Sequence, residues 1–408
     1  VQVVSNPFRA SNSSNASNEE TMGWTRSSKN SSGLQTEIKT FVGSSLPAPL
    51  GANENSTGSV LTNVDGDRVL VTDQAGKRRI SKTNALGQLE EVWEVLAASE
   101  AGSESVAFPN TTVAHGFRTA YGYDTLNNLT TVSQGVQTRT FSYSSLSRLL
   151  SAANPESGTI SYQYDPNGNL TSKTDARSIT TTYSYDALNR VTQRSYSGET
   201  GYTTPTVNYT YGTVAPAIGR LTKVESSIST TEYTEFDILG RIKAHKQTTD
   251  GQDYTTGYVY NLSGALIEQT YPSGRKVKST LDADGNLAQV HSRNSSTDIW
   301  RPYASNFVYT AAGAVSSMKL GNGRFENTAF NSRLQPTQIG LGSSATNQGL
   351  LKLNYDYGST NNNGNVLSQT ITVPTVGQTP GFTAVQNYTY DSLNRLKSAT
   401  ENIDGNPT

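Results

Sequence analysis

The sequence predicts an all-β fold: a long antiparallel meander of hairpins, coiled into a spiral shell or into an open part of one. Three observations predict it: a composition rich in strand and turn formers, a hairpin motif that recurs along the chain, and a nearly constant spacing between copies. A recurring unit of this kind is typical of a protein in which each repeat packs mainly on its neighbours.

The composition favours strands and turns. Among the 408 residues are 22 Tyr and 35 Gly, while only 34% are hydrophobic and 16% are charged. Tyrosine and threonine favour strands, and glycine and asparagine favour turns. The low share of charged residues distinguishes the chain from an intrinsically disordered one.

The recurring motif is Tyr-x-Tyr-Asp-x-x-Gly/Asn-x-aliphatic. Its four clear copies begin Tyr121-x-Tyr123-Asp124, Tyr162-x-Tyr164-Asp165, Tyr183-x-Tyr185-Asp186 and Tyr388-x-Tyr390-Asp391. Nine weaker copies carry, at the Asp position, Asn30, Asp73, Asn84, Ser144, Asp237, Asn261, Asp282, Thr310 and Asn331. Three residues later stands Gly or Asn in eleven of the thirteen copies, among them Gly168, Asn189, Gly240, Gly264, Gly285, Gly313 and Asn394. Ser147 and Leu334 are the two exceptions.

Each copy has the features of one hairpin turn. Tyr-x-Tyr places two rings on the same face of a strand, because side chains alternate. The following Asp or Asn can start a type I turn by bonding to its own backbone. Gly or Asn three residues on can adopt a positive φ, which is the favoured way to close such a hairpin. The aliphatic residue then starts the return strand and packs across the hairpin.

The spacing of the turns predicts how the hairpins connect. Asp124, Ser144, Asp165 and Asp186 are 20, 21 and 21 residues apart, which fits two strands and two turns per unit. Consecutive units should therefore form an antiparallel meander, and a long meander must coil or close because sheets twist. Two further units, at 209–212 and 355–358, keep both tyrosines but have longer tips.

At this point the motif resembles the YD repeat of RHS-type proteins. That family includes bacterial RHS polymorphic toxins, the C subunits of insecticidal toxin complexes and animal teneurins. Asp186-Ala187-Leu188-Asn189-Arg190-Val191 and Asp237-Ile238-Leu239-Gly240-Arg241-Ile242 are close to the family consensus. The resemblance covers residues 62–400, and more faintly 24–40.

The resemblance implies a hollow β-sheet shell that encloses or carries a variable C-terminal domain, often a toxin. It further implies a large secreted or cell-surface bacterial protein, whose remaining repeats and cargo domain are this segment's partners. Bacterial members cleave themselves at a Pro-x-x-x-x-Asp-Pro-x-Gly core. The nearest string here, Asp165-Pro166-Asn167-Gly168, lacks the upstream Pro and lies inside an ordinary repeat, so we interpret it as a turn.

The repeats divide the chain into two predicted parts. Residues 1–58 are predicted to be a degenerate N-terminal segment with a loop or linker, and residues 59–408 the YD-repeat sheet. We expect a loose entry segment or plug-like loop at 1–22, a linker at 43–59 and an interruption of the repeats at 94–114. Glu90–Ala98 could form one or two helical turns, but we expect a return strand over its first half. The chain has no initial Met and ends soon after a repeat, so we expect a fragment of a longer protein.

The sequence contains no assembled chemistry. With no Cys, disulfides, thiolate metal sites and Cys nucleophiles are excluded. His115, His245 and His291 lie far apart and lack the spacing of metal ligands. A net charge of −1 disfavours nucleic acid as a partner, and no apolar run is long enough for a membrane-spanning helix. The prediction is a non-catalytic chain with no cofactor and no metal.

Two roles remain open for the aromatic residues. Periodic tyrosines indicate a structural ladder, since a binding site is local whereas a ladder extends along the chain. Trp93 and Trp300 fall outside the repeat frame and are the candidate ligand contacts. The sequence therefore predicts a wall segment, with a surface adhesin or carbohydrate-binding module that contacts cell-surface glycans as the alternative.

Overall fold

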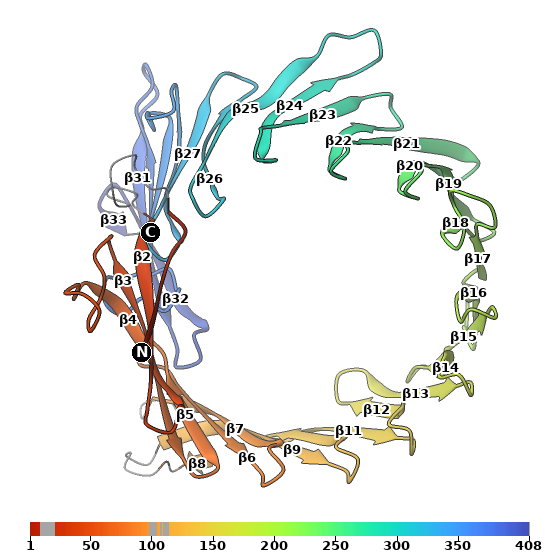
Figure 1. Ribbon diagram of the computed structural model, residues 1–408, viewed down its shortest axis with the longest axis horizontal. Coiled ribbons are helices and arrows are strands. Elements are labelled where there is room, and N and C mark those ends of the chain that lie inside the picture. Colours follow the sequence, from red (N-terminus) through yellow and green to blue (C-terminus); the bar gives the residue numbers. More distant parts are fainter. Residues whose placement is uncertain (9–20, 98–103, 107, 109–113, 408) are drawn as a thin grey trace. The chain divides into compact units, whose positions relative to one another are not determined.

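The computed structural model (Figure 1) describes residues 1–8, 21–97, 104–106, 108 and 114–407. The described residues form β-strands and no helix, so the all-β prediction is confirmed. The chain forms two compact units: unit 1 comprises Val1–Thr119 and Pro302–Thr408, and unit 2 comprises Ala120–Arg301. The predicted division at residues 58 and 59 is a different one and stays a prediction.

The strands of unit 1 come from both ends of the chain. The first group is β1 (Gln2–Ser5), β2 (Gly23–Lys29), β3 (Gln35–Val42), β4 (Ser56–Asp65), β5 (Arg68–Thr72), β6 (Arg78–Thr83), β7 (Leu89–Leu96), β8 (Glu104–Val106) and β9 (Ala114–Tyr123). The second group is β25 (Arg301–Tyr309), β26 (Val315–Leu320), β27 (Phe325–Phe330), β28 (Pro336–Gly342), β29 (Leu351–Asp356), β30 (Ser368–Val373), β31 (Phe382–Tyr390), β32 (Leu396–Ile403) and β33 (Asn406–Pro407).

Unit 2 is built from one uninterrupted stretch of the chain, which also includes residues 120–123 at the end of β9 and Arg301 at the start of β25. Its strands are β10 (Leu129–Gln134), β11 (Gln137–Tyr143), β12 (Leu149–Asn154), β13 (Gly158–Tyr164), β14 (Leu170–Thr174), β15 (Thr180–Tyr185), β16 (Val191–Ser197), β17 (Val207–Tyr211), β18 (Leu221–Glu225), β19 (Ser229–Phe236), β20 (Ile242–Thr249), β21 (Gln252–Tyr260), β22 (Leu266–Thr270), β23 (Lys276–Leu281) and β24 (Leu287–Arg293).

The strand pairing is that of a meander. In unit 2 each strand from β10 to β23 pairs antiparallel with the next, and the hairpins follow one another in chain order (Figure 1). In unit 1 the same holds from β1 to β7 and from β25 to β33. Strands β8 and β9 depart from it, since β9 pairs with both β8 and β7.

The structure refines several expectations near the N-terminus. Strand β1 lies in the segment expected to show little strand pattern, while residues 9–20 of that segment lie outside the described residues. The expected linker is shorter than 43–59, because β4 already begins at Ser56. The return strand expected over the first half of Glu90–Ala98 is present and continues to Leu96, and the helical alternative is wrong. Residues 98–103, 107 and 109–113 of the expected interruption also lie outside the described residues.

The hydrophobic core is concentrated in unit 1. Its cluster comprises Leu70, Ile80, Trp93, Val95 and Phe108, on β5, β6, β7 and the segment after β8. Among the described residues of unit 2, Ala152 is the one buried hydrophobic side chain, at 6% exposure. Burial of apolar area therefore contributes much less per residue in unit 2, and contacts between neighbouring hairpins must supply more of its order.

Candidate functional site

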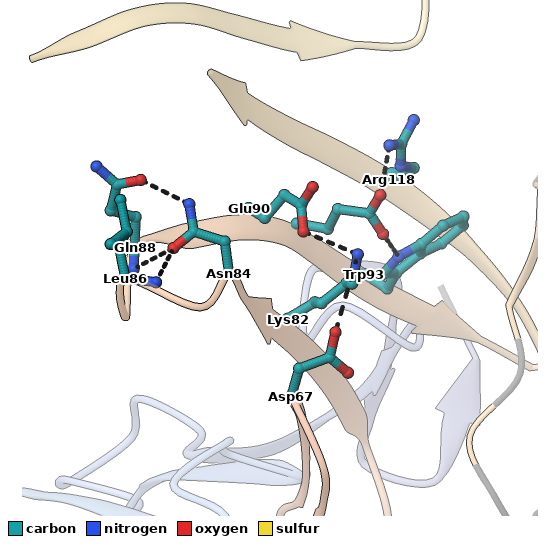
Figure 2. A network of polar contacts seen from close by, with 9 residues as sticks. Asp67, Lys82, Asn84, Leu86, Gln88, Glu90, Trp93 and Arg118 are labelled. Atoms are coloured by element: carbon teal, nitrogen blue, oxygen red, sulfur yellow. Dashed lines mark hydrogen bonds and ion pairs between the residues drawn. The ribbon is translucent and has the colours of Figure 1, made fainter. Parts of the chain in front are cut away.

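In each of the thirteen copies of the motif, the first residue of the turn closes it with its own side chain. Asp186 Oδ1 accepts the backbone N–H groups of Leu188 at 2.9 Å and Arg190 at 3.0 Å. Asn84 accepts the equivalent pair from Leu86 and Gln88, at 3.0 Å each (Figure 2). The turns at Asp73, Asp124, Asp237, Asp282 and Asp391 repeat this pair of bonds. A short acceptor side chain is what the type I turn requires at this place.

The left-handed residue of the turn is present in all thirteen copies. Positive φ is adopted at every predicted Gly or Asn position, for instance 93° at Gly168 and 58° at Asn189. Ser147 and Leu334, the two exceptions to the residue pattern, adopt it too, with φ of 57° and 60°. A Leu is costly in this region, so at Leu334 the surrounding hairpin imposes the conformation.

Sequence reasoning missed three turns of the same geometry. They begin at Asp175, Tyr271 and Leu320, and in each the first residue's N–H donates to the carbonyl of the fifth residue and its carbonyl accepts from the N–H of the fourth. The available signal was the half-repeat spacing, since Asp175 lies midway between the turns at Asp165 and Asp186.

Several turn aspartates also hold the side chain four residues on. Arg190 Nε donates to Asp186 Oδ2 at 2.7 Å, and Arg241 and Arg395 pair with Asp237 and Asp391 in the same way. The guanidinium and backbone N–H of Arg190 hold the pKa of Asp186 below its ordinary value, against the opposing effect of partial desolvation. In the turns at Asp124, Asp165 and Asp282 an Asn amide takes the place of the guanidinium.

The same arginines reach the neighbouring repeat. The Arg190 guanidinium carbon lies 4.2 Å from the centre of the Tyr211 ring, and that of Arg241 lies 4.7 Å from the Tyr260 ring. Arg148, whose turn begins with Ser144, instead donates to the carbonyl of Asp165 in the next turn at 2.8 Å. Each of these side chains therefore joins two consecutive hairpins.

A second connection comes from the second tyrosine of the motif. Its hydroxyl donates to the carbonyl at the start of the preceding repeat's return strand, a contact that we call the tyrosine bridge. Four bridges are Tyr185 to Leu170 at 2.8 Å, Tyr211 to Val191 at 3.0 Å, Tyr357 to Pro336 at 3.1 Å and Tyr390 to Val366 at 2.8 Å. The tyrosines thus act as a structural ladder at these positions.

In unit 1 an early repeat, the one with its turn at Asp73, meets the last repeats of the chain. Asp73 Oδ2 accepts the side-chain amides of Asn363 at 3.0 Å and Asn394 at 3.2 Å. The Ala97 N–H donates to Ser392 Oγ at 2.8 Å. Asn394, predicted only as a left-handed turn residue, therefore also joins segments more than 300 residues apart.

Charged side chains surround the turn at Asn84. The Lys82 ammonium lies 2.8 Å from Glu90 and 3.9 Å from Asp67 (Figure 2). Beside them, Glu91 accepts the indole N–H of Trp93 at 3.1 Å and pairs with Arg118 at 2.5 Å. These bonds keep the pKa of Glu91 below its ordinary value, although burial acts in the opposite direction.

Comparisons with known proteins agree with this repeat geometry. The family model described as RHS Repeat matches residues 164–200, the segment that contains the Asp165 and Asp186 turns. This segment of the chain therefore matches an RHS repeat, in agreement with the resemblance that the motif shows.

Solved structures share the fold of this chain over nearly its whole length. In the crystal structure titled TcdB2-TccC3-Cdc42 the TM-score is 0.71 at 14% identity, covering 93% of this chain and 21% of that one. In TcdB2-TccC3 without its hypervariable C-terminal region the TM-score is 0.68 at 13% identity, covering 95% and 24%. A Tc holotoxin pore from Photorhabdus luminescens matches at TM-score 0.68 and 12% identity, with the same coverage. The chain thus spans less than a quarter of the chains it matches, and no curated protein sequence matches it.

The remaining candidate residues are distributed over the sheet. His245 on β20 lies 3.1 Å from the Tyr258 hydroxyl and stacks on that ring, while His115 is on β9 and His291 on β24. Within the described ranges, no group of three or more His, Asp or Glu side chains is arranged to hold a metal ion. The same ranges contain no helix with the length and apolar character of a membrane span.

The two tryptophans proposed as ligand contacts differ in exposure. Trp93 is 8% exposed and belongs to the core cluster of unit 1, which leaves little of its ring for a ligand. Trp300 is half-buried, with the Arg293 guanidinium 4.8 Å from the ring centre. Ligand contact at either residue stays a prediction.

Proposed function

We propose that this chain is a non-catalytic segment of the β-sheet wall of a larger RHS protein, secreted by a bacterium or displayed on its surface. The wall would enclose or present a C-terminal effector domain of the same polypeptide. The observation that carries the proposal is the regular joining of consecutive hairpins by tyrosine bridges and arginines. These contacts extend a sheet one hairpin at a time and leave its turns with structural roles.

The small hydrophobic core of unit 2 supports the interpretation of this unit as part of a wall rather than as a globular domain. A single layer of strands with one buried hydrophobic side chain among its described residues has almost no hydrophobic core of its own. Such a layer can instead cover a large area, as in repeat proteins whose length is set by the number of units. The Tc-toxin proteins whose solved structures share this fold are named as parts of multi-chain assemblies, which favours a role within a larger protein.

Limited proteolysis of the parent protein tests the wall. The C-terminal domain should be cleaved at least tenfold more slowly within the full-length protein than when it is produced alone. The double variant Tyr185→Phe, Tyr211→Phe, which removes two neighbouring bridges, should speed its cleavage. Equal cleavage of the C-terminal domain in the full-length and isolated forms would show that the wall encloses nothing.

Glycan binding is the second candidate, and the observation that favours it is the half-buried Trp300 ring beneath Arg293. An aromatic ring with an accessible face can pack on a sugar ring. On an array of cell-surface glycans, binding that is lost in Trp300→Ala and kept in Trp24→Ala would support it. An array with no bound glycan would remove it.

A further inference from the structure

Two neighbouring repeats of unit 2 depart from the motif at the same place. At the position of the turn aspartate stands Gly212, although Arg220 still closes that turn. At the position of the bridging tyrosine in the following repeat stands Phe236. Each departure removes one polar group that the Asp186 turn and Tyr211 supply in the preceding repeat.

The first departure leaves a cation without a carboxylate. Arg190 and Arg241 on either side are paired with Asp186 and Asp237 and stacked on tyrosine rings. In the described part of the chain, Arg220 takes part in no ion pair and donates only to the Leu239 carbonyl, at 3.2 Å. Its side chain is exposed, so its positive charge is available to a ligand.

The second departure leaves a carbonyl without its hydroxyl. In the preceding repeats, Tyr185 and Tyr211 donate to the carbonyls of Leu170 and Val191. Leu221 occupies the equivalent position at the start of β18, and Phe236 has no hydroxyl to donate to it.

Both departures line one cavity. It has a volume of about 670 Å³ and is lined by Arg220, Leu221, Tyr233, Phe236, Ile242 and Tyr260 among others. Tyr233, Phe236 and Tyr260 are half-buried, so their rings form apolar walls while the opening stays accessible. Small-molecule sites combine such a volume and apolar lining with a few polar groups.

We propose that this cavity binds a uronic acid unit of an acidic polysaccharide. The sugar carboxylate would pair with the Arg220 guanidinium, whose planar fork suits a carboxylate. A sugar hydroxyl would donate to the Leu221 carbonyl in place of the absent tyrosine, and the apolar face of the ring would pack on the aromatic walls. The inference does not depend on the wall function, since it concerns one joint of the sheet.

Calorimetric titration of the purified chain with trigalacturonic acid tests the site. We expect saturable binding that weakens as salt is raised, because a charge pair is involved. Galactotriose, which lacks the carboxylates, and citrate, which lacks the sugar ring, should not bind at the same concentration. No binding of trigalacturonic acid, or equal binding of either control compound, would overturn the proposal.

Two variants place the ligand in this cavity. Arg220→Gln should weaken binding about tenfold or more, because a charge-assisted pair is lost. Phe236→Tyr should weaken it as well, since the new hydroxyl takes the Leu221 carbonyl. Arg148→Gln is the matched control: this arginine also closes a turn without an aspartate, but it does not line the cavity. With unchanged circular dichroism in all three, wild-type affinity in Arg220→Gln or Phe236→Tyr, or an equal loss in Arg148→Gln, would refute the site.

Discussion

Two consecutive joints of the sheet differ in their side-chain contacts, although the strands pair antiparallel at both. We call the place where the turn of one repeat meets the strand end of the next repeat a joint. At the Asp186 joint, the turn 186–190 meets the strand end at Tyr211, with an ion pair, a stacked guanidinium and a tyrosine bridge. At the Gly212 joint, the turn 212–220 meets the strand end at Phe236, and the ion pair and the bridge are both missing. Strand β18 still pairs antiparallel with β19. Strand pairing alone is therefore enough to continue the sheet, and the side chains at a joint can have a role other than joining the hairpins.

Low pH should produce the largest difference in stability between the two joints. The folded-state pKa of Asp186 is lowered, first by the Arg190 guanidinium and then by the Arg190 N–H. A carboxyl group with a lowered pKa stabilises the fold above its unfolded-state pKa, and this contribution is lost as the pH falls. Below about pH 4, hydrogen exchange corrected for its intrinsic rate should quicken at 186–190 and change little at 212–220, which has no turn carboxylate.

The pKa is lowered in the same direction at Asp124, Asp165, Asp237, Asp282 and Asp391. The midpoint temperature of thermal unfolding of the whole chain should therefore decrease as the pH is lowered from about 5 to about 3. A midpoint that rises over this range would contradict the role of the turn aspartates.

Substitution of the left-handed glycines comes next in size. An added Cβ at Gly168 would lie 3.2 Å from the Arg148 guanidinium, and at Gly240 it would lie 2.5 Å from Arg220. Gly168→Val and Gly240→Val should each lower the free energy of unfolding by about 2 kcal/mol, because a β-branched residue is strained at positive φ, whereas the flexible guanidinium ends can move aside. The control Gly285→Val has the same strain with no atom near the added Cβ, and should cost about the same. Unchanged thermal midpoints at Gly168 and Gly240 would refute the turn assignment.

Loss of one tyrosine bridge should have a smaller effect. Tyr211→Phe keeps the ring under Arg190 and removes only the hydroxyl that donates to Val191. The expected cost is about 1 kcal/mol in urea unfolding, the typical contribution of one hydrogen bond. Tyr254→Phe, on an exposed ring, should change stability by no more than a few tenths of a kcal/mol. An equal cost in both variants would show that the bridge contributes nothing.

The reverse change at the Gly212 joint should have the smallest effect. Phe236→Tyr should raise the free energy of unfolding by about 0.5 kcal/mol, because the new hydroxyl can donate to Leu221. Urea unfolding of this variant beside Tyr211→Phe measures both directions of the same change. A loss of stability in Phe236→Tyr would mean that the cavity does not admit the hydroxyl.

Much of the fold was predictable because the turn is a local structure. Asp186 bonds to residues two and four positions away, and Asn189 needs only its own backbone conformation. Such interactions reach at most four positions along the chain, so the residue types reveal them directly. Leu334 shows the limit of this reasoning, since its left-handed backbone comes from the hairpin around it and leaves no trace in its residue type.

The amino-acid sequence by itself determined the hairpin turns, the order of the meander and the β class, since each depends on neighbours along the chain. Only the tertiary structure decided which residues join separate repeats: Arg190 with Tyr211, Asp73 with Asn394, and Arg220 with Phe236 around one cavity. These partners lie between 16 and 321 residues apart, and spacing along the chain does not specify them. Their contacts arise only once the strands have paired and brought one hairpin beside the next.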